Sequence, residues 1–166
     1  MVKYYQPLTE GISFGMTTSV ITALGMMTGL YSATSSKLAV VAGIVIMAIA
    51  DGLSDAVSLH TVKETEIKKG QARFTPKEVW LTTLFTFLAV ACFTLTFTIP
   101  VMLLPLKTAI LVSMAWGAIL IISLNFYIAK LRKENPIKQL TEHLLLTAFV
   151  IVISYFIGNW IAWAFR

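Results

Sequence analysis

Two aspartates, Asp51 and Asp55, lie in a stretch whose other residues are typical of a membrane-spanning helix. Residues four apart on an α-helix share one face and are about 6 Å apart along its axis. An ionisable side chain deep in a bilayer costs at least ~2.5–3.5 kcal/mol, so its presence there indicates a functional site. Two carboxylates on one face are suited to binding a cation or carrying a proton.

A depth estimate predicts which other side chains share this layer. The span that contains the aspartates has its centre near Met47, which places Asp51 about 6 Å to the cytoplasmic side of the centre. On the preceding antiparallel span, Thr17 and Thr18 come to the same level. Carboxylate and hydroxyl oxygens with a nearby thioether suit Fe²⁺ or Mn²⁺. The predicted metal site is therefore Asp51, Asp55, Thr18, Thr17 and Met47.

Each group of polar residues also has a purely structural interpretation. The aspartates, if protonated or hydrogen-bonded to neighbouring Ser, Thr and Asn side chains, would serve only the packing of helices. One turn beyond the apolar part of the same helix, a possible cytoplasmic entry site for a cation consists of His60, Glu64 and Glu66. Lysines interleave with these residues, so a solvated helix end with ion pairs is the alternative interpretation.

Long apolar segments must position these residues. The chain has 166 residues, of which 57% are hydrophobic and 13% charged, and about 20 apolar residues cross ~30 Å of hydrocarbon. We predict an all-α membrane protein with five transmembrane helices in one bundle, a single domain of residues 1–166. The expected spans are about 11–32, 38–60, 77–99, 107–130 and 141–165, and the expected cytoplasmic linkers are 61–76 and 131–140.

The basic residues predict the orientation of the bundle. Of 13 Lys and Arg residues, ten fall at the amino terminus or in the two linkers, and only Lys37, Lys107 and Arg166 fall on the other side. Cytoplasmic loops carry an excess of Lys and Arg. We expect the amino terminus in the cytoplasm and the carboxyl terminus outside or in a lumen, in an inner or plasma membrane. The net charge of +5 then reflects topology, and we expect no nucleic-acid partner. The ten residues are Lys3, Lys63, Lys68, Lys69, Arg73, Lys77, Lys130, Arg132, Lys133 and Lys138.

Small residues recur on the first span at alternating steps of four and three. They are Gly11, Gly15, Thr18, Thr22, Gly25 and Gly29. Such a stripe allows close contact between helices. It predicts that this helix packs centrally or at the axis of a homodimer. In a two-fold dimer the aspartate site would be duplicated around the axis.

Three local signals predict the ends of helices. The short turn at 33–37 makes the first two helices antiparallel neighbours. The second helix is expected to continue past His60 into water and to stop at Gly70, because glycine favours the conformation that ends a helix. Thr75, Pro76 and Glu78 have the spacing of a capping box that starts the third helix.

The sequence contains none of the phosphate-loop, GxSxG, HExxH or CxxC motifs. We therefore expect a transporter and not an enzyme, with no permanently bound cofactor.

Two segments resemble the vacuolar iron transporter family. The segment GMTTSVITALGMMTGLYSAT of the first span is similar to the glycine-rich first helix of that family, and MAIADGLSDAVSLHTVKETE is similar to its second helix. The family's Asn and Asp on the first helix fall on Thr17 and Thr18. Its Met and Glu on the second helix fall on Asp51 and Asp55.

The resemblance implies a homodimer that exports Fe²⁺ or Mn²⁺ from the cytoplasm, coupled to protons. Two other functions fit the same residues. One is a proton- or sodium-coupled transporter of another small cation, and the other is a membrane scaffold that transports nothing.

Overall fold

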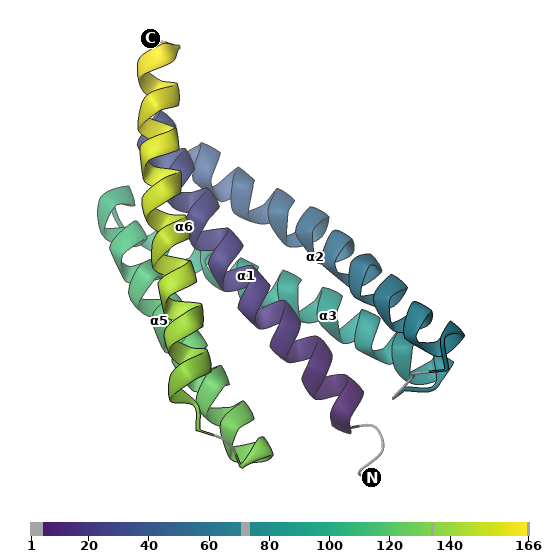
Figure 1. Ribbon diagram of the computed structural model, residues 1–166. Helices are drawn as coiled ribbons and strands as arrows, with labels where there is room; N and C mark the ends of the chain where they lie inside the picture. The colour runs from purple at the N-terminus through teal and green to yellow at the C-terminus, as the bar shows by residue number, and fades with distance from the viewer. Residues whose placement is uncertain (1–4, 71–73, 134, 166) are drawn as a thin grey trace.

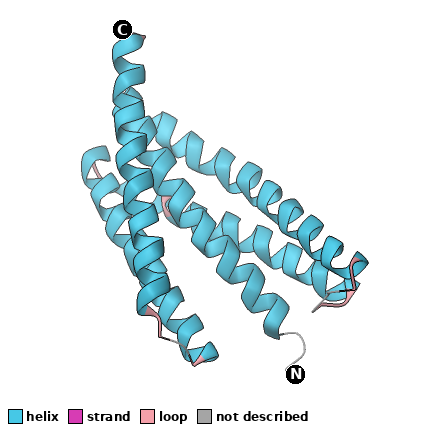
Figure 2. Cartoon of the chain, in the orientation of Figure 1, coloured by secondary structure: helices cyan, strands magenta, loops and turns pink. Residues whose placement is uncertain are grey.

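A computed structural model describes residues 5–70, 74–133 and 135–165, and in these ranges the chain is a bundle of helices (Figures 1 and 2). Five helical segments are long and apolar enough to cross a membrane, with α3 and α4 together forming one of them. The predicted five-span, all-α fold is confirmed, and the protein is an integral multi-pass membrane protein. The helices are α1 (Tyr5–Thr34), α2 (Lys37–Lys68), α3 (Pro76–Thr96), α4 (Thr98–Leu103), α5 (Leu106–Arg132) and α6 (Ile137–Ala164).

Most charged side chains lie at one end of the bundle, which we call the charged end. There α1, α3 and α6 begin and α2 and α5 end (Figure 1). It carries Glu10, the lysines that follow His60, and Lys130. Of the residues in the predicted charge bias, Lys3, Arg73, Arg166 and the side chain of Arg132 lie outside the described part of the chain.

The hairpin between α1 and α2 is tighter than expected, because only Ser35 and Ser36 separate the two helices. Ser36 caps α2 by accepting a hydrogen bond from the Ala39 amide at 3.2 Å. Helix α2 then continues to Lys68, well past the apolar span, and Gly70 follows it with φ +69°. The predicted extension of this helix toward Gly70 is confirmed.

The third span begins as expected and breaks before its predicted end. The carboxylate of Glu78 accepts hydrogen bonds from the Thr75 amide at 2.7 Å and from its hydroxyl at 2.8 Å, which completes the capping box. Helix α3 ends at Thr96, and α4 continues the span to Leu103. The break has a physical reason. Pro100 has no amide hydrogen to bond to the carbonyl of Thr96, and its ring disfavours an uninterrupted helix.

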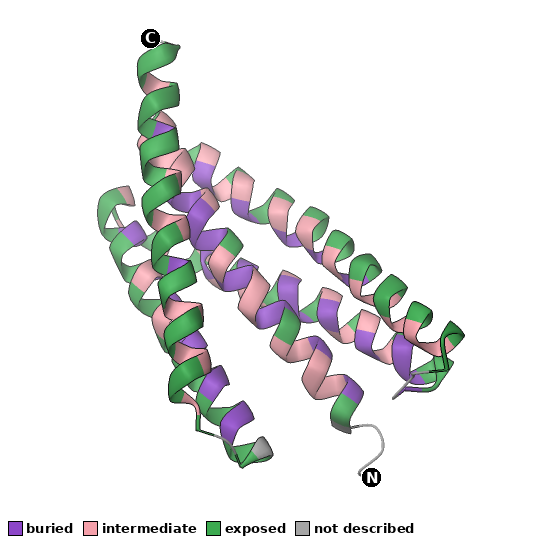
Figure 3. Cartoon of the chain, in the orientation of Figure 1, coloured by how far each residue is buried: buried purple, intermediate pink, exposed green. Residues whose placement is uncertain are grey.

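Helix α1 is the central element of the bundle. Figure 3 shows buried and half-buried positions along most of α1, whereas α6 is exposed along most of its length. Val20, Ala23, Leu24 and Met27 are at most 2% exposed. The exposed side chains of α6 are large and apolar, for example Phe156, which is the surface expected to face lipid. The predicted central position of this helix is confirmed.

The small residues of α1 serve two different contacts within the chain. A Cβ atom on Gly11 or Gly15 would come within 2.6 Å and 2.8 Å of the backbone of α3, at the carbonyls of Thr82 and Thr86. A Cβ atom on Gly25 would come within 2.6 Å of Val150 on α6. These glycines are occupied inside one chain, so they are not free to form the homodimer contact that the sequence predicted through this helix.

Candidate metal site in the seam between α1 and α2

Helices α1 and α2 pack antiparallel with a constant register. Glu10 pairs with Lys63, Thr22 hydrogen-bonds to Asp51, and Leu30 lies against Gly43. Between these pairs, an advance of a given number of residues along α1 matches a retreat of the same number of residues along α2. We call this line of contacts the α1–α2 seam. Helix α3 forms its floor, since both helices contact α3 through glycines, Gly15 on α1 and Gly52 on α2.

The two aspartates face α1 in this seam, one turn apart. The hydroxyl of Thr22 donates a hydrogen bond to Asp51 Oδ2 at 3.0 Å. The hydroxyl of Thr18 donates to the carbonyls of Phe14 at 3.1 Å and Gly15 at 3.3 Å in its own helix, and its side chain lies beside the carboxyl group of Asp55. The prediction that Thr18 shares the layer of Asp51 is therefore wrong by one helical turn. Thr18 belongs to the layer of Asp55, and Thr22, absent from the predicted site, is the partner of Asp51.

The tight hairpin explains this offset. The depth estimate gave each helix its own centre in the bilayer. In the structure, only two residues join Thr34 to Lys37, and counting back from that junction brings Asp51 opposite Val20, within two residues of its actual partner Thr22. A register set by a covalent connection overrides a depth estimated from hydropathy, because hydropathy determines the position of a helix only to within about a turn.

Asp55 contributes an oxygen atom that is buried and has no hydrogen-bond partner. This atom is Oδ2, and the side chain that bears it is only partly exposed. A buried carboxylate oxygen without a partner is unfavourable unless a proton or a cation neutralises it. In the described part of the chain no three His, Cys, Asp or Glu side chains gather as a metal site. The contacts along the seam bring together the carboxylates of Asp51 and Asp55 and the hydroxyls of Thr22 and Thr18.

The other two predicted ligands lie apart from this layer. The hydroxyl of Thr17 donates to the carbonyl of Ser13 in its own helix at 2.9 Å, and its position next to Thr18 is about 100° around the helix from the seam. Met47 is partly buried against the core, one turn from Asp51 on the side away from Asp55. The register places Met26 of α1 opposite Met47, and the sulfur of Met26 lies close to Gly43. A layer of thioethers thus follows the layer of oxygens.

The predicted entry residues have separate partners. His60 Nδ1 lies 2.9 Å from the hydroxyl of Thr83 on α3, and its ring packs against Trp80 with centroids 4.4 Å apart and the ring planes inclined at 51°. Glu64 pairs with Lys68 at 3.0 Å, and Glu66 lies 3.6 Å from the amine of Lys63. The arrangement matches the alternative interpretation, a helix end stabilised by ion pairs.

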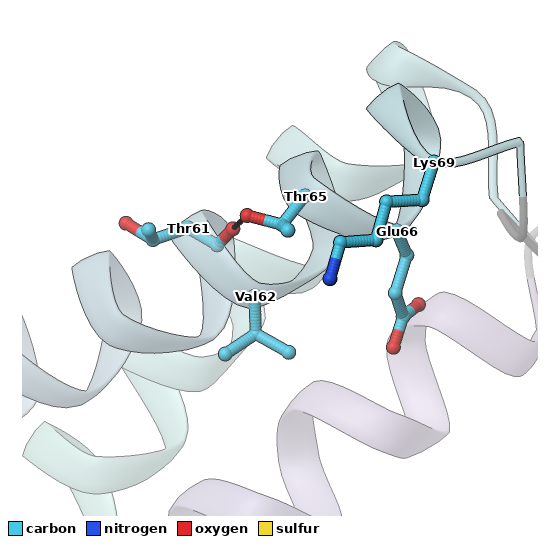
Figure 4. Close-up of a pocket in the computed structure, with 5 residues that line it drawn as sticks. All are labelled: Thr61, Val62, Thr65, Glu66 and Lys69. Atoms are coloured by element: carbon cyan, nitrogen blue, oxygen red, sulfur yellow. Dashed lines mark hydrogen bonds between the residues drawn. The ribbon is translucent and has the colours of Figure 1, made fainter.

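A pocket of about 300 Å³ lies beside this end of α2 (Figure 4). Its lining residues belong to the last turns of α2 and the cap that follows: Thr61, Val62, Thr65, Glu66 and Lys69. In Figure 4 the side chain of Glu66 extends toward α1, and the Thr65 hydroxyl bonds to the carbonyl of Thr61. The pocket contains neither aspartate, so it is separate from the candidate site.

Comparisons of the chain with protein-family models, with curated proteins and with solved structures found no match. The case for a function therefore depends on the seam itself. Sequence reasoning missed Thr22, Met26 and the pairing of Glu10 with Lys63. The available signal was the shortness of the hairpin turn, from which the partners along both helices can be found by counting to within about two residues.

Proposed function

We propose that this protein is a divalent-metal transporter that exports Fe²⁺ or Mn²⁺ from the cytoplasm in exchange for protons. The observation that carries the proposal is the pair Asp51 and Asp55 in the α1–α2 seam, with one Asp55 oxygen buried and unpartnered. A dication would bind when both carboxylates are ionised, and protons from the other side of the membrane would displace it. The choice of Fe²⁺ or Mn²⁺ follows the expectation from the sequence resemblance to vacuolar iron transporters, a family that no comparison matches.

The donor atoms favour a divalent metal over an alkali cation. The carboxylates supply hard oxygen ligands, which alone would suit many cations. The thioethers of Met47 and Met26, one turn farther along the seam, would favour a transition metal during passage. A proton- or sodium-coupled transporter of another small cation remains the competing function, and a scaffold is the second.

Transport by the purified protein tests the proposal directly. In proteoliposomes, we expect uptake or release of Fe²⁺, Mn²⁺ or Co²⁺ that is accelerated by a proton gradient. In detergent, these ions should raise the unfolding temperature, because a ligand that binds only the folded state stabilises it by RT ln(1 + [L]/Kd). A rise in the unfolding temperature with Na⁺ and with none of these metal ions would favour a proton- or sodium-coupled transporter of another small cation. The absence of both transport and stabilisation with every cation would favour the scaffold.

A homodimer is the second part of the proposal. Thr22 is exposed and Asp51 is only half-buried, although both lie within the apolar part of the bundle. Lipid tails offer no hydrogen bonds to such groups. A second copy placed over the open side of the seam would cover them and bring its own carboxylates to the site. The contact would then be the mouth of the seam, because the glycines of α1 are already buried in the chain.

Cross-linking of Thr22→Cys should detect this dimer. In a Cys92→Ala background, oxidation in membranes is expected to convert most of the Thr22→Cys chains to a disulfide-linked dimer. Phe149→Cys is the matched control, since Phe149 is exposed on α6 and lies at a similar depth. Monomeric Thr22→Cys after oxidation, or dimers formed equally well by Phe149→Cys, would contradict a contact at the seam.

A further inference from the structure

Lys63 joins three segments at the charged end of the α1–α2 seam. Its amine forms ion pairs with Glu10 on α1 and with Glu66 on its own helix. The same amine lies 5.3 Å from the centre of the Phe74 ring, just before α3. The side chain of Lys63 is only 12% exposed, which is unusual because lysine is normally among the most exposed residues.

This cluster lies directly in line with the candidate metal site. Glu10 precedes Thr18 by eight residues on α1, and Lys63 follows Asp55 by eight residues on α2. At 1.5 Å per residue, the ion pair is about 12 Å from the Asp55 layer. The register places Phe14 and Leu59 between the two. A cation entering from the charged end would meet the closed ion pair first and two apolar side chains next.

We propose that the Glu10–Lys63 ion pair is a gate that closes the charged end of the seam. In the described conformation the gate is shut: Lys63 holds α1 and α2 together through its ion pair with Glu10. Opening requires Lys63 to separate from Glu10, which lets the end of α2 move away from α1. Glu10 is 38% exposed, so water can replace its partner when the pair separates. Glu10, released, would then be a negative group at the entrance.

The role of this gate in metal transport rests on the proposed function. The closure of the seam by the ion pair does not, and it can be tested separately. The gate predicts that water and small reagents reach the Asp55 layer from the charged end only when the ion pair is broken. Access to one position in the seam can be measured without any transported ion. The two hypotheses can therefore fail separately.

Thiol labelling at Thr18 provides the test. Thr18→Cys is introduced in a Cys92→Ala background, and membrane vesicles that expose the charged end are treated with a membrane-impermeant thiol reagent. We expect slow labelling in this parent. Lys63→Met and Glu10→Gln should each increase the labelling rate at least tenfold. The charge-swapped double variant Glu10→Lys, Lys63→Glu should return the rate to within about threefold of the parent, because the pair is restored.

The ion pair of Glu64 with Lys68 supplies a matched control. It is on the same helix, and both of its side chains are at least half exposed. Glu64→Gln should leave the labelling rate unchanged. The unfolding temperature of each variant is measured in parallel, so that a rate from an unfolded protein is recognised. Parent-like labelling in both folded single variants would overturn the gate, as would an equal increase in Glu64→Gln. If labelling follows the prediction while purified protein transports no cation, the gate stands and the proposed function fails.

Discussion

Asp51→Asn should reduce metal transport by at least ~100-fold and leave the fold intact. Even groups in the outer shell of a metal site cost about 10–100-fold in affinity or activity when mutated, and a charged ligand is expected to exceed that range. Asparagine has the shape of aspartate and can still accept the hydrogen bond that Thr22 donates at 3.0 Å. The change therefore removes the charge, and the packing of α1 on α2 is preserved. The initial rate of Mn²⁺ transport in proteoliposomes is the measurement.

Two further variants separate charge from packing. Thr22→Val deletes the hydroxyl partner of Asp51 and should lower the rate by about ten- to a hundredfold, in line with the ~1.5–3 kcal/mol of one hydrogen bond to a charged group. Ser54→Ala changes an exposed residue of α2 between the two aspartates and should transport as fast as wild type. If Asp51→Asn transports at the wild-type rate, the assignment of Asp51 as a ligand is lost. A low rate accompanied by a lower unfolding temperature would instead indicate a structural role.

Gly158→Ala should destabilise the protein by about 1–3 kcal/mol, the usual cost of overpacking a tight contact. A Cβ atom at this position of α6 would come within 2.4 Å of the backbone carbonyl of Gly29 and 2.0 Å of the Ser32 hydroxyl oxygen on α1. The serine side chain can rotate, but the carbonyl cannot move without displacing α1. Because α1 is the central helix, its displacement affects every other contact. The free energy of unfolding, measured by denaturant titration in mixed micelles, reports the change.

Gly29→Ala is the matched control in the same contact between α1 and α6. A Cβ atom on Gly29 would lie 3.5 Å from the Ser154 carbonyl oxygen, an ordinary van der Waals distance. Both substitutions replace glycine by alanine inside a helix and gain the same helix propensity, about 1 kcal/mol. The difference between the free energies of unfolding of the two variants therefore reports the packing of α1 against α6 alone. Equal stability of the two variants would show that α1 and α6 are not held as close as described here.

The sequence by itself determined the features that depend on local composition. Five long apolar segments must become helices in a bilayer, because a helix satisfies its own backbone hydrogen bonds where lipid cannot. The capping box at Thr75 and the stop after Lys68 were also predictable, since each depends on a few neighbouring residues. The aspartate pair stood out for a similar reason: a charge inside an apolar run is visible without knowing the fold.

Only the tertiary structure decided which residues meet. The packing register of α1 and α2 placed Thr22 at Asp51 and Thr18 beside Asp55, one turn away from the estimate based on depth. The glycine stripe of α1 was divided between α3 and α6, because a central helix packs different faces against different neighbours along its length. Glu10 and Lys63 are 53 residues apart in the sequence, and neither has a local signal that predicts the other. Such pairings follow from how whole helices pack and connect, which no short stretch of sequence contains.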